Sequence, residues 1–199
     1  MKLIFDAKTI IPYKDEVYRY LGYKKTSSRK YDIPDEIKQI VLECIDEMQN
    51  VLKPQLVYEI FPIEFLKEIE LESKDLNINL RNCSHFILFA ATIGPLVDKL
   101  LLQTQKLDIA KSLIMQTTGA MFIESLVDKF RDYCKEEASK KNFKLKPRFS
   151  PGFGDLTLKY QRKIFDILKC EQQIALTLND SLVMSPEKSV TAFIGLVKL

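Results

Sequence analysis

Apolar residues recur at helical spacing over two long stretches of the chain. In "DIPDEIKQIVLECIDEMQNVL" they lie three and four residues apart, acidic residues fill the first turn, and Asp32 is the expected N-terminal cap. In "LDIAKSLIMQTTGAMFIESLVDKFRDYCKEEASKKN" the same spacing continues from Leu107 to Tyr133 and runs into a charged end. Both patterns predict amphipathic helices. The second predicts the longest helix of the chain, with Gly119 as its weakest position.

Shorter apolar patterns predict strands around these helices. "SHFILFAATIG" is an unbroken apolar run bounded by turn residues, which is typical of a strand buried on both faces. "QLVYEIFPI" predicts a strand with Pro62 at its end or at a sheet edge. The opening "MKLIFDAKTI" and the later "QIALTLND" and "SVTAFIGL" predict further strands.

Three short helices complete the prediction, in "KDEVYRYLGY", "SKDLNINLRNC" and "TLKYQRKIFDILK". Gly22 marks the end of the first, and the Gly94–Pro95 pair marks the start of a further helix. Because helices and strands alternate without the regular spacing of βαβ units, the predicted class is α+β, with a mixed, mainly antiparallel sheet and flanking helices. No linker divides the sequence, so we expect residues 1–199 to form a single domain.

Composition narrows the class of partner. The chain has 199 residues, of which 46% are hydrophobic and 29% charged, which is enough to bury a core. Thirty basic against 27 acidic residues give a net charge of +3 that is spread along the chain, so we expect no nucleic-acid partner. No window reaches the roughly 20 apolar residues of a membrane-spanning helix, and the start lacks a signal-peptide pattern. These features predict a cytoplasmic protein without a membrane partner.

The sequence offers no recognisable catalytic or metal-binding motif. Its four cysteines lie far apart without a CxxC pair, and it has one histidine, His85, so we expect reduced thiols and no metal site. The patterns GxSxG, GxxxxGK[ST] and GxGxxG are absent. His85 lies beside the apolar "FILFAA" with no Ser, Asp or Cys at a catalytic spacing, which indicates a core histidine rather than a general base. No catalytic residue is predicted.

The stretch "KPRFSPGFGD", from Lys146 to Asp155, differs from the rest of the chain because it combines two prolines, two glycines and an arginine. The prolines stiffen the backbone, the glycines allow a ligand to approach it, and the Arg148 guanidinium can bind a carboxylate. On the residues alone, the stretch is either a binding loop for a small anion or a tight turn in which Arg148 pairs with a local acid such as Asp155.

Three linked blocks carry a family resemblance. "RFSPGFGD", the helix "LKYQRKIFDIL" and "IALTLNDSLVMSPEKSVTAFIGL" resemble the C-terminal half of the activation domain of vitamin B12-dependent methionine synthase, over the signature region 146–196. That family has an R-x-[SA]-P-G-Y loop, a short helix, an L-T-[ED]-S-[FL]-x-M-x-P segment and a Ser-Val strand. The chain keeps Arg148, Ser150, Pro151, Gly152, Ser181, Met184, Pro186, Ser189 and Val190. Weaker similarity in "RYLGY", "AATIG" and "ESLVDKF" extends the resemblance over nearly the whole chain.

The resemblance implies a site for S-adenosylmethionine. Arg148 matches the family arginine that holds the ligand carboxylate, and Ser150 and Gly152 lie on the loop whose backbone meets the ligand. Glu124, in "ESLVDKF", matches the family glutamate at the ligand site, where an acid near a sulfonium and an ammonium is electrostatically favourable. From the residues alone, Glu124 fits equally a solvated position on an amphipathic helix.

Three positions depart from the family pattern. Phe153 replaces the usual tyrosine and keeps the ring without the hydroxyl, and Asp180 stands where the family often has glutamate. Both remain candidates for the ligand site. Ser185 stands where the family has tryptophan, on the segment expected to face the cobalamin.

The resemblance also implies a function and partners. The chain has no D-x-H-x-x-G motif, so the cobalamin is expected on a partner, either the cobalamin-binding module of a methionine synthase or another corrinoid protein. The chain is then a stand-alone reactivation subunit of a methyltransferase system, which presents the methyl group of S-adenosylmethionine to cob(II)alamin while flavodoxin or a similar reductant supplies an electron. The alternatives are an accessory subunit of another corrinoid methyltransferase and an interaction protein that has lost S-adenosylmethionine binding.

Overall fold

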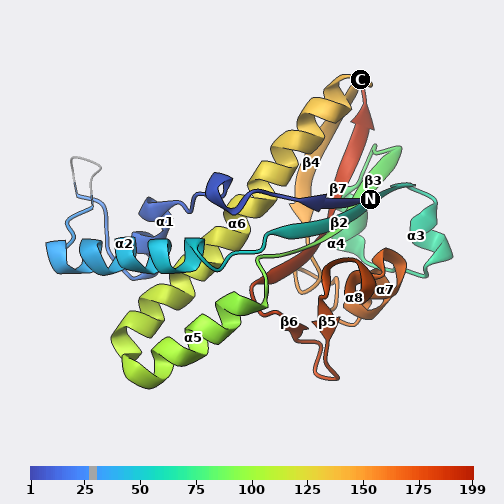
Figure 1. The fold of residues 1–199 in the computed structure, drawn as a ribbon. Coiled ribbons are helices and arrows are strands. Elements are labelled where there is room, and N and C mark those ends of the chain that lie inside the picture. Colours follow the sequence, from blue (N-terminus) through green and yellow to red (C-terminus); the bar gives the residue numbers. More distant parts are fainter. Residues whose placement is uncertain (27–30) are drawn as a thin grey trace.

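The fold is built on a five-stranded antiparallel sheet with helices on both faces (Figure 1). The structure is a computed structural model that describes residues 1–26 and 31–199, so part of the predicted polar loop "KKTSSRK" lies outside the described residues. The sheet order is β1-β2-β3-β7-β4. Its strands are β1 (Lys2–Ile4), β2 (Gln55–Pro62), β3 (His85–Thr92), β7 (Ser189–Lys198) and β4 (Phe143–Phe149). Each neighbouring pair is antiparallel, which confirms the predicted α+β class.

The apolar strand predictions hold best in the middle of the sheet. β3 pairs with β2 on one side and with β7 on the other, and it is buried over residues 86–92, as its unbroken apolar run predicts. Pro62 is the last residue of β2, at the strand end where its missing N–H costs no central ladder bond. β7, near the C-terminus, lies inside the sheet between β3 and β4.

The first face of the sheet is covered by helices that share the larger core cluster. These are α1 (Lys14–Tyr20), α2 (Asp35–Gln49), α5 (Pro95–Leu107) and α6 (Ile109–Ser139). α6 is the longest, with 31 residues, and crosses the sheet so that its last turns lie beside the end of the chain (Figure 1). The expected Asp32 cap is wrong: the N-cap of α2 is Pro34. Because the residue before a proline is disfavoured in the helical region, the helix starts only after Pro34.

Gly119 does not interrupt α6. A Cβ at this position would lie 3.2 Å from Lys188 Cε and 3.3 Å from Met48 Cε, so the glycine lets two side chains pack closely against the helix. Gly94 caps α5 with φ at 96°, and Pro95 takes the first helical position, as predicted.

The second face carries shorter helices around a separate core cluster. They are α3 (Phe65–Glu68), α4 (Lys74–Asn79), α7 (Tyr160–Leu168) and α8 (Cys170–Ile174). A small hairpin of β5 (Thr177–Leu178) and β6 (Met184–Ser185) follows them. The strand predicted in "QIALTLND" therefore shortens to two residues, because its first residues belong to α8 and Ala175 leaves that helix in the left-handed conformation. α3, α8 and the short 3-10 helix η1 (Ala7–Thr9) were not predicted from the sequence.

All four cysteines are buried free thiols. Burial raises the pKa of Cys44 to about 11 and the pKa values of Cys134 and Cys170 to about 12. Within residues 1–26 and 31–199, none of the helices combines the length and apolarity needed to cross a membrane. The same residues contain no group of three or more His, Cys, Asp or Glu side chains that could hold a metal ion.

Candidate functional site

Arg148 and Glu124 meet where the edge strand β4 lies against the long helix α6. Arg148 Nη2 donates a hydrogen bond to Glu124 Oε2 at 2.6 Å, although the residues are 24 positions apart in the chain. The two side chains are 33% and 41% exposed, so the pair lies at the surface of the seam between helix and sheet. In this structure the partner of Arg148 is therefore Glu124 on α6 and not Asp155.

A β-bulge in β4 aims Arg148 at α6. Leu145 pairs with Leu196 and Arg148 pairs with Ile194. Between these two pairs β4 has two residues and β7 has one, so β4 contains one extra residue. In a regular strand, two residues that are three positions apart, such as Leu145 and Arg148, point to opposite faces of the sheet. Because of the bulge, Leu145 and Arg148 both face the same side of the sheet as Leu196 and Ile194, which belong to the core under α6. Pro147 lies inside this bulge, where no ladder bond is lost.

The strand also corrects the sequence prediction. Lys146, Pro147 and Arg148 were read as part of a loop, but they belong to β4, which ends at Phe149. The sequence pattern does not predict this strand, because lysine and proline are both uncommon in strands. Arg148 is therefore held by a paired strand instead of a free loop.

Half of the Arg148 guanidinium lacks an acceptor. Its Nη1 atom is buried and has no hydrogen-bond partner among the described residues, whereas Nη2 is bonded to Glu124. An arginine side chain presents five N–H donors in a flat fork, and leaving a buried donor unpaired costs about 1 to 3 kcal/mol. This orphaned group calls for an anionic or polar acceptor from outside the described chain.

The loop after β4 has a fixed backbone. Phe153 N donates to Ser150 O at 3.2 Å, and Gly152 N donates to Leu156 O at 2.7 Å. Gly152 has φ at 93°, a conformation that residues with a side chain rarely adopt, and a Cβ there would lie 3.2 Å from Leu158. The glycine is therefore required by the turn itself.

Asp155 anchors the loop to the second face of the sheet. Its carboxylate accepts hydrogen bonds from the Ser73 hydroxyl, from Lys74 N at 2.8 Å and from Asp75 N at 3.2 Å, at the start of α4. The Ser73 and Lys74 bonds hold the pKa of Asp155 below its ordinary value. Asp155 N in turn donates to Asp75 Oδ2 at 3.1 Å. A Cβ on Gly154 would overlap the Asp75 carboxylate, so this glycine allows the close approach.

Sequence reasoning missed this anchor. Ser73 and Asp155 are 82 positions apart, and a contact across that distance leaves no local pattern in the sequence. Its consequence is that the loop carrying the candidate ligand residues is tied at both ends, by β4 and by α4.

The remaining predicted residues fall into two groups. Ser150 and Gly152 come after β4, two and four residues beyond Arg148, and Phe153 at the turn is 65% exposed. Asp180 lies at the β5–β6 hairpin, where its carbonyl oxygen accepts from Arg162 Nη2 at 3.2 Å. Among the described residues, no hydrogen bond or ion pair joins Asp180 to Arg148 or Glu124.

The class that fold and site define is an α+β fold in which an arginine on the edge strand β4 pairs with a glutamate on α6, beside a rigid glycine turn. Among solved structures, the chain is similar to the MetH reactivation domain in its crystal structure with AdoHcy, with a TM-score of 0.69 and 14% sequence identity, over 98% of this chain and 77% of that chain. The family resemblance is thus confirmed at the level of the fold. No protein-family model and no curated protein matches the sequence.

Proposed function

We propose that the chain binds S-adenosylmethionine, with Arg148 at the ligand carboxylate and Glu124 at its ammonium group. The observation that carries this proposal is the 2.6 Å contact between the two side chains. They come from separate elements, yet both are charged residues that the family resemblance assigns to one ligand site. A guanidinium can hold a carboxylate through two parallel hydrogen bonds, and a carboxylate attracts both the ammonium and the sulfonium of the ligand.

The residues present fit the amino-acid end of this ligand. Nη1 of Arg148 is buried without an acceptor in the described chain, and a ligand carboxylate would supply one. Glu124 bonds to Arg148 through Oε2, which leaves Oε1 for the ligand ammonium. The turn at Gly152 holds the backbone still, and the exposed ring of Phe153 offers an aromatic face to the purine. AdoHcy, bound by the similar MetH domain, has the same amino-acid and purine groups.

The function that follows is the presentation of a methyl group to a corrinoid held by a partner, as a stand-alone reactivation subunit. When bound, S-adenosylmethionine would supply the methyl group and leave as S-adenosylhomocysteine, while the partner's corrinoid and flavodoxin or a similar reductant would supply the cobalt and the electron. The chemistry belongs to the cofactors. This chain's part is to hold the methyl donor in line and to exclude water, which converts a bimolecular encounter into an effectively intramolecular step.

The test is a calorimetric titration of the full chain with S-adenosylmethionine. We expect binding, and we expect Arg148→Ala to weaken it about 10- to 150-fold, which corresponds to about 1.5 to 3 kcal/mol for a charge-assisted contact. Arg148→Lys should not restore the affinity, because an ammonium lacks the planar fork. Lys146→Ala is the matched control. Lys146 lies on the same strand, but its side chain packs over Gly195 on the other face of the sheet, so its loss should leave binding unchanged.

A second measurement separates the alternatives. A cob(II)alamin-loaded methionine synthase fragment with S-adenosylmethionine and a low-potential reductant should form methylcobalamin faster when the chain is added, as followed by visible absorbance. Acceleration only with a different corrinoid protein would identify an accessory subunit of another methyltransferase. If the chain does not bind S-adenosylmethionine at all, the interaction-protein alternative replaces the proposal.

A further inference from the structure

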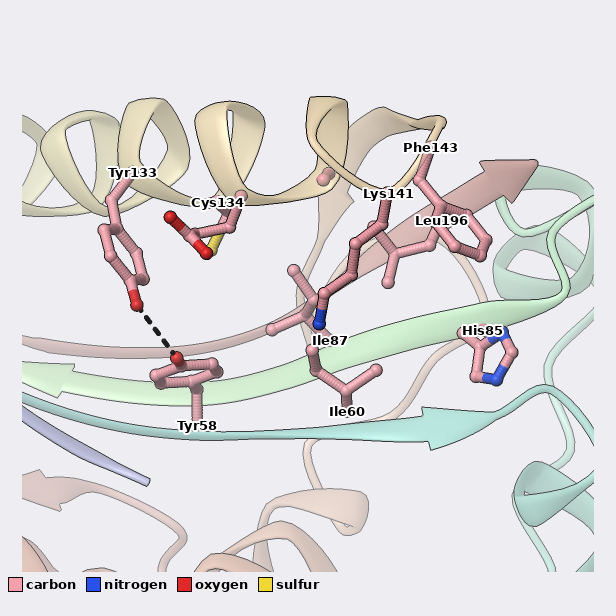
Figure 2. Close-up of a pocket in the computed structure, with 11 residues that line it drawn as sticks. Tyr58, Ile60, His85, Ile87, Tyr133, Cys134, Lys141, Phe143 and Leu196 are labelled. Carbon is pink, nitrogen blue, oxygen red and sulfur yellow. Dashed lines mark hydrogen bonds between the residues drawn. The ribbon is translucent and has the colours of Figure 1, made fainter. Parts of the chain in front are cut away.

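A separate cavity lies further along α6, between its last turns and the sheet (Figure 2). Its volume is about 220 Å³, and its floor is formed by Ile60, Ile87 and Leu196 from three strands. Cys134 on α6 lines it, ten residues beyond Glu124, which is about 15 Å along the helix axis at 1.5 Å per residue. None of the residues that line this cavity belongs to the Arg148 site, so it is a different place on the same seam.

One end of the cavity carries two tyrosine hydroxyls. Tyr58 reaches up from β2 and Tyr133 reaches down from α6, and their oxygens are 3.4 Å apart (Figure 2). That distance is long for an O–H···O bond, whose usual length is about 2.7 to 2.8 Å, so the pair retains hydrogen-bonding capacity. Burial and the contact with Tyr133 raise the pKa of Tyr58, so its hydroxyl stays neutral and can donate.

The other part of the cavity carries an ammonium group. Lys141, in the turn that follows α6, extends toward the sheet and lines the cavity together with Ile60 and Ile87 (Figure 2). Across the described ranges, no carboxylate lies within ion-pair distance of this nitrogen. Glu137, the acid that lines the cavity, is paired with Lys140 at 2.5 Å, and the pKa of Glu137 is lowered first by this pair and to a smaller extent by the charge of Lys141. Lys141 is an exposed residue, so water screens its attraction for an anion and its contribution to binding is modest.

We propose that this cavity binds a small one-ring aromatic carboxylate, with its ring on the Ile60–Ile87–Leu196 floor and its carboxylate at Lys141. A polar group on the far side of the ring would bond to the hydroxyls of Tyr58 and Tyr133. The size fits this class, since an engineered cavity of about 150 Å³ holds benzene, and a cavity of about 220 Å³ has room for a short substituent as well. The phenolic rings and His85 add aromatic contacts around the ligand.

This inference goes beyond the proposed function and does not rest on it. Because the two sites use different residues, S-adenosylmethionine should not displace an aromatic carboxylate from the cavity. Failure of S-adenosylmethionine binding would leave the cavity proposal intact, and the reverse also holds.

The experiment is a titration of the full chain with 4-fluorophenylacetate, followed by 19F NMR line width and shift. We expect saturable binding and a weaker response from 4-fluorophenylacetamide, a neutral ligand of almost the same shape. Unlabelled 4-hydroxyphenylacetate should displace the probe at lower concentration than phenylacetate, because its hydroxyl meets the tyrosine pair. Lys141→Gln should lower the affinity about three- to tenfold. Lys135→Gln is the matched control, because Lys135 is an exposed lysine on α6, six residues before Lys141, that does not line this cavity.

Filling the cavity is the stricter test. Ala138 is a buried residue of α6 that lines the cavity, and Ala138→Phe should abolish binding of the probe. If this variant fails to fold, Ile60→Trp provides a second obstruction, because Ile60 lines the cavity yet is 43% exposed and tolerates a larger ring. No saturable binding to the unmodified chain, or binding that survives in a folded cavity-filling variant, overturns the proposal. Equal affinity for the acid and the amide overturns the assignment of the carboxylate to Lys141.

Discussion

The seam between α6 and the sheet differs at its two ends. At the Arg148–Glu124 pair the sheet edge is bent by a bulge and followed by a turn with a fixed backbone, and the chemistry is concentrated in two opposite charges. At the cavity the lining is mostly apolar, and the polar groups stand apart at its margins. One helix thus borders both the site proposed for S-adenosylmethionine and the cavity proposed for an aromatic carboxylate, because the strand residues opposite it differ.

Neither end contributes much to the stability of the fold. An ion pair that is about one third exposed is worth roughly 0 to 1 kcal/mol, and a cavity forgoes the dispersion contacts that packed side chains would make. A buried guanidinium nitrogen without a partner is a further cost. Ligand-binding sites are expected at positions that contribute little to the stability of the fold or reduce it. Both ends of the seam fit this description.

The largest expected effect comes from the turn beside the ion pair. Gly154 has φ at 52°, and a Cβ there would overlap the Asp75 carboxylate, so Gly154→Val should lower the free energy of unfolding by about 3 kcal/mol or more. Urea unfolding measures this value. Gly22→Val is the control, because φ at Gly22 is 89° but no atom lies within 4 Å of the added Cβ, so only backbone strain remains. Equal losses in the two variants would contradict the anchoring of the turn to α4.

An intermediate effect should separate the two ends functionally. Glu124→Gln keeps the shape of the side chain but removes its charge, so it should weaken S-adenosylmethionine by about 1 kcal/mol, or roughly fivefold, and leave 4-fluorophenylacetate binding unchanged. Lys141→Gln should do the reverse. Calorimetry for the first ligand and 19F NMR for the second give both answers on each variant. A variant that weakens both ligands would show that the two ends of α6 act as one site.

The fold was largely predictable from apolar periodicity. β3 and α6 carry patterns long enough to decide their type, and the Gly94–Pro95 pair marks the start of α5. β4 was missed because its residues alternate with lysines and contain a proline, a combination that only the pairing with β7 makes into a strand. The strand expected over "QIALTLND" was overestimated, because tertiary packing places its first residues in α8.

The two sites differ in how far the sequence predicts them. The Arg148 site has a local signal, ten consecutive residues rich in proline and glycine, and its one distant member, Glu124, was found through the family resemblance. Its anchor at Ser73 and Asp75 has no such signal. The cavity has none at all, because Tyr58, His85 and Lys141 come from separate elements and each is an ordinary residue in its own segment. Such a site exists only once the sheet and α6 are packed together.

The smallest expected effect tests whether the cavity wall is dry. Cys134 lines the cavity, and burial raises the pKa of its thiol from its ordinary value near 9 to about 12. A thiol whose pKa is higher in the folded state binds more protons there, so its contribution to stability is complete below pH 9 and is lost as the pH rises toward 12. The stability advantage of the unmodified chain over Cys134→Ala should therefore shrink by about 0.8 kcal/mol between pH 8 and pH 9.5, since each pH unit above 9 is worth about 1.4 kcal/mol. Denaturant unfolding of both proteins at the two pH values measures it, and the other cysteines cancel in the difference. A constant difference would mean that the thiol is hydrated, and the contrast between a polar and a dry end of the seam would then be lost.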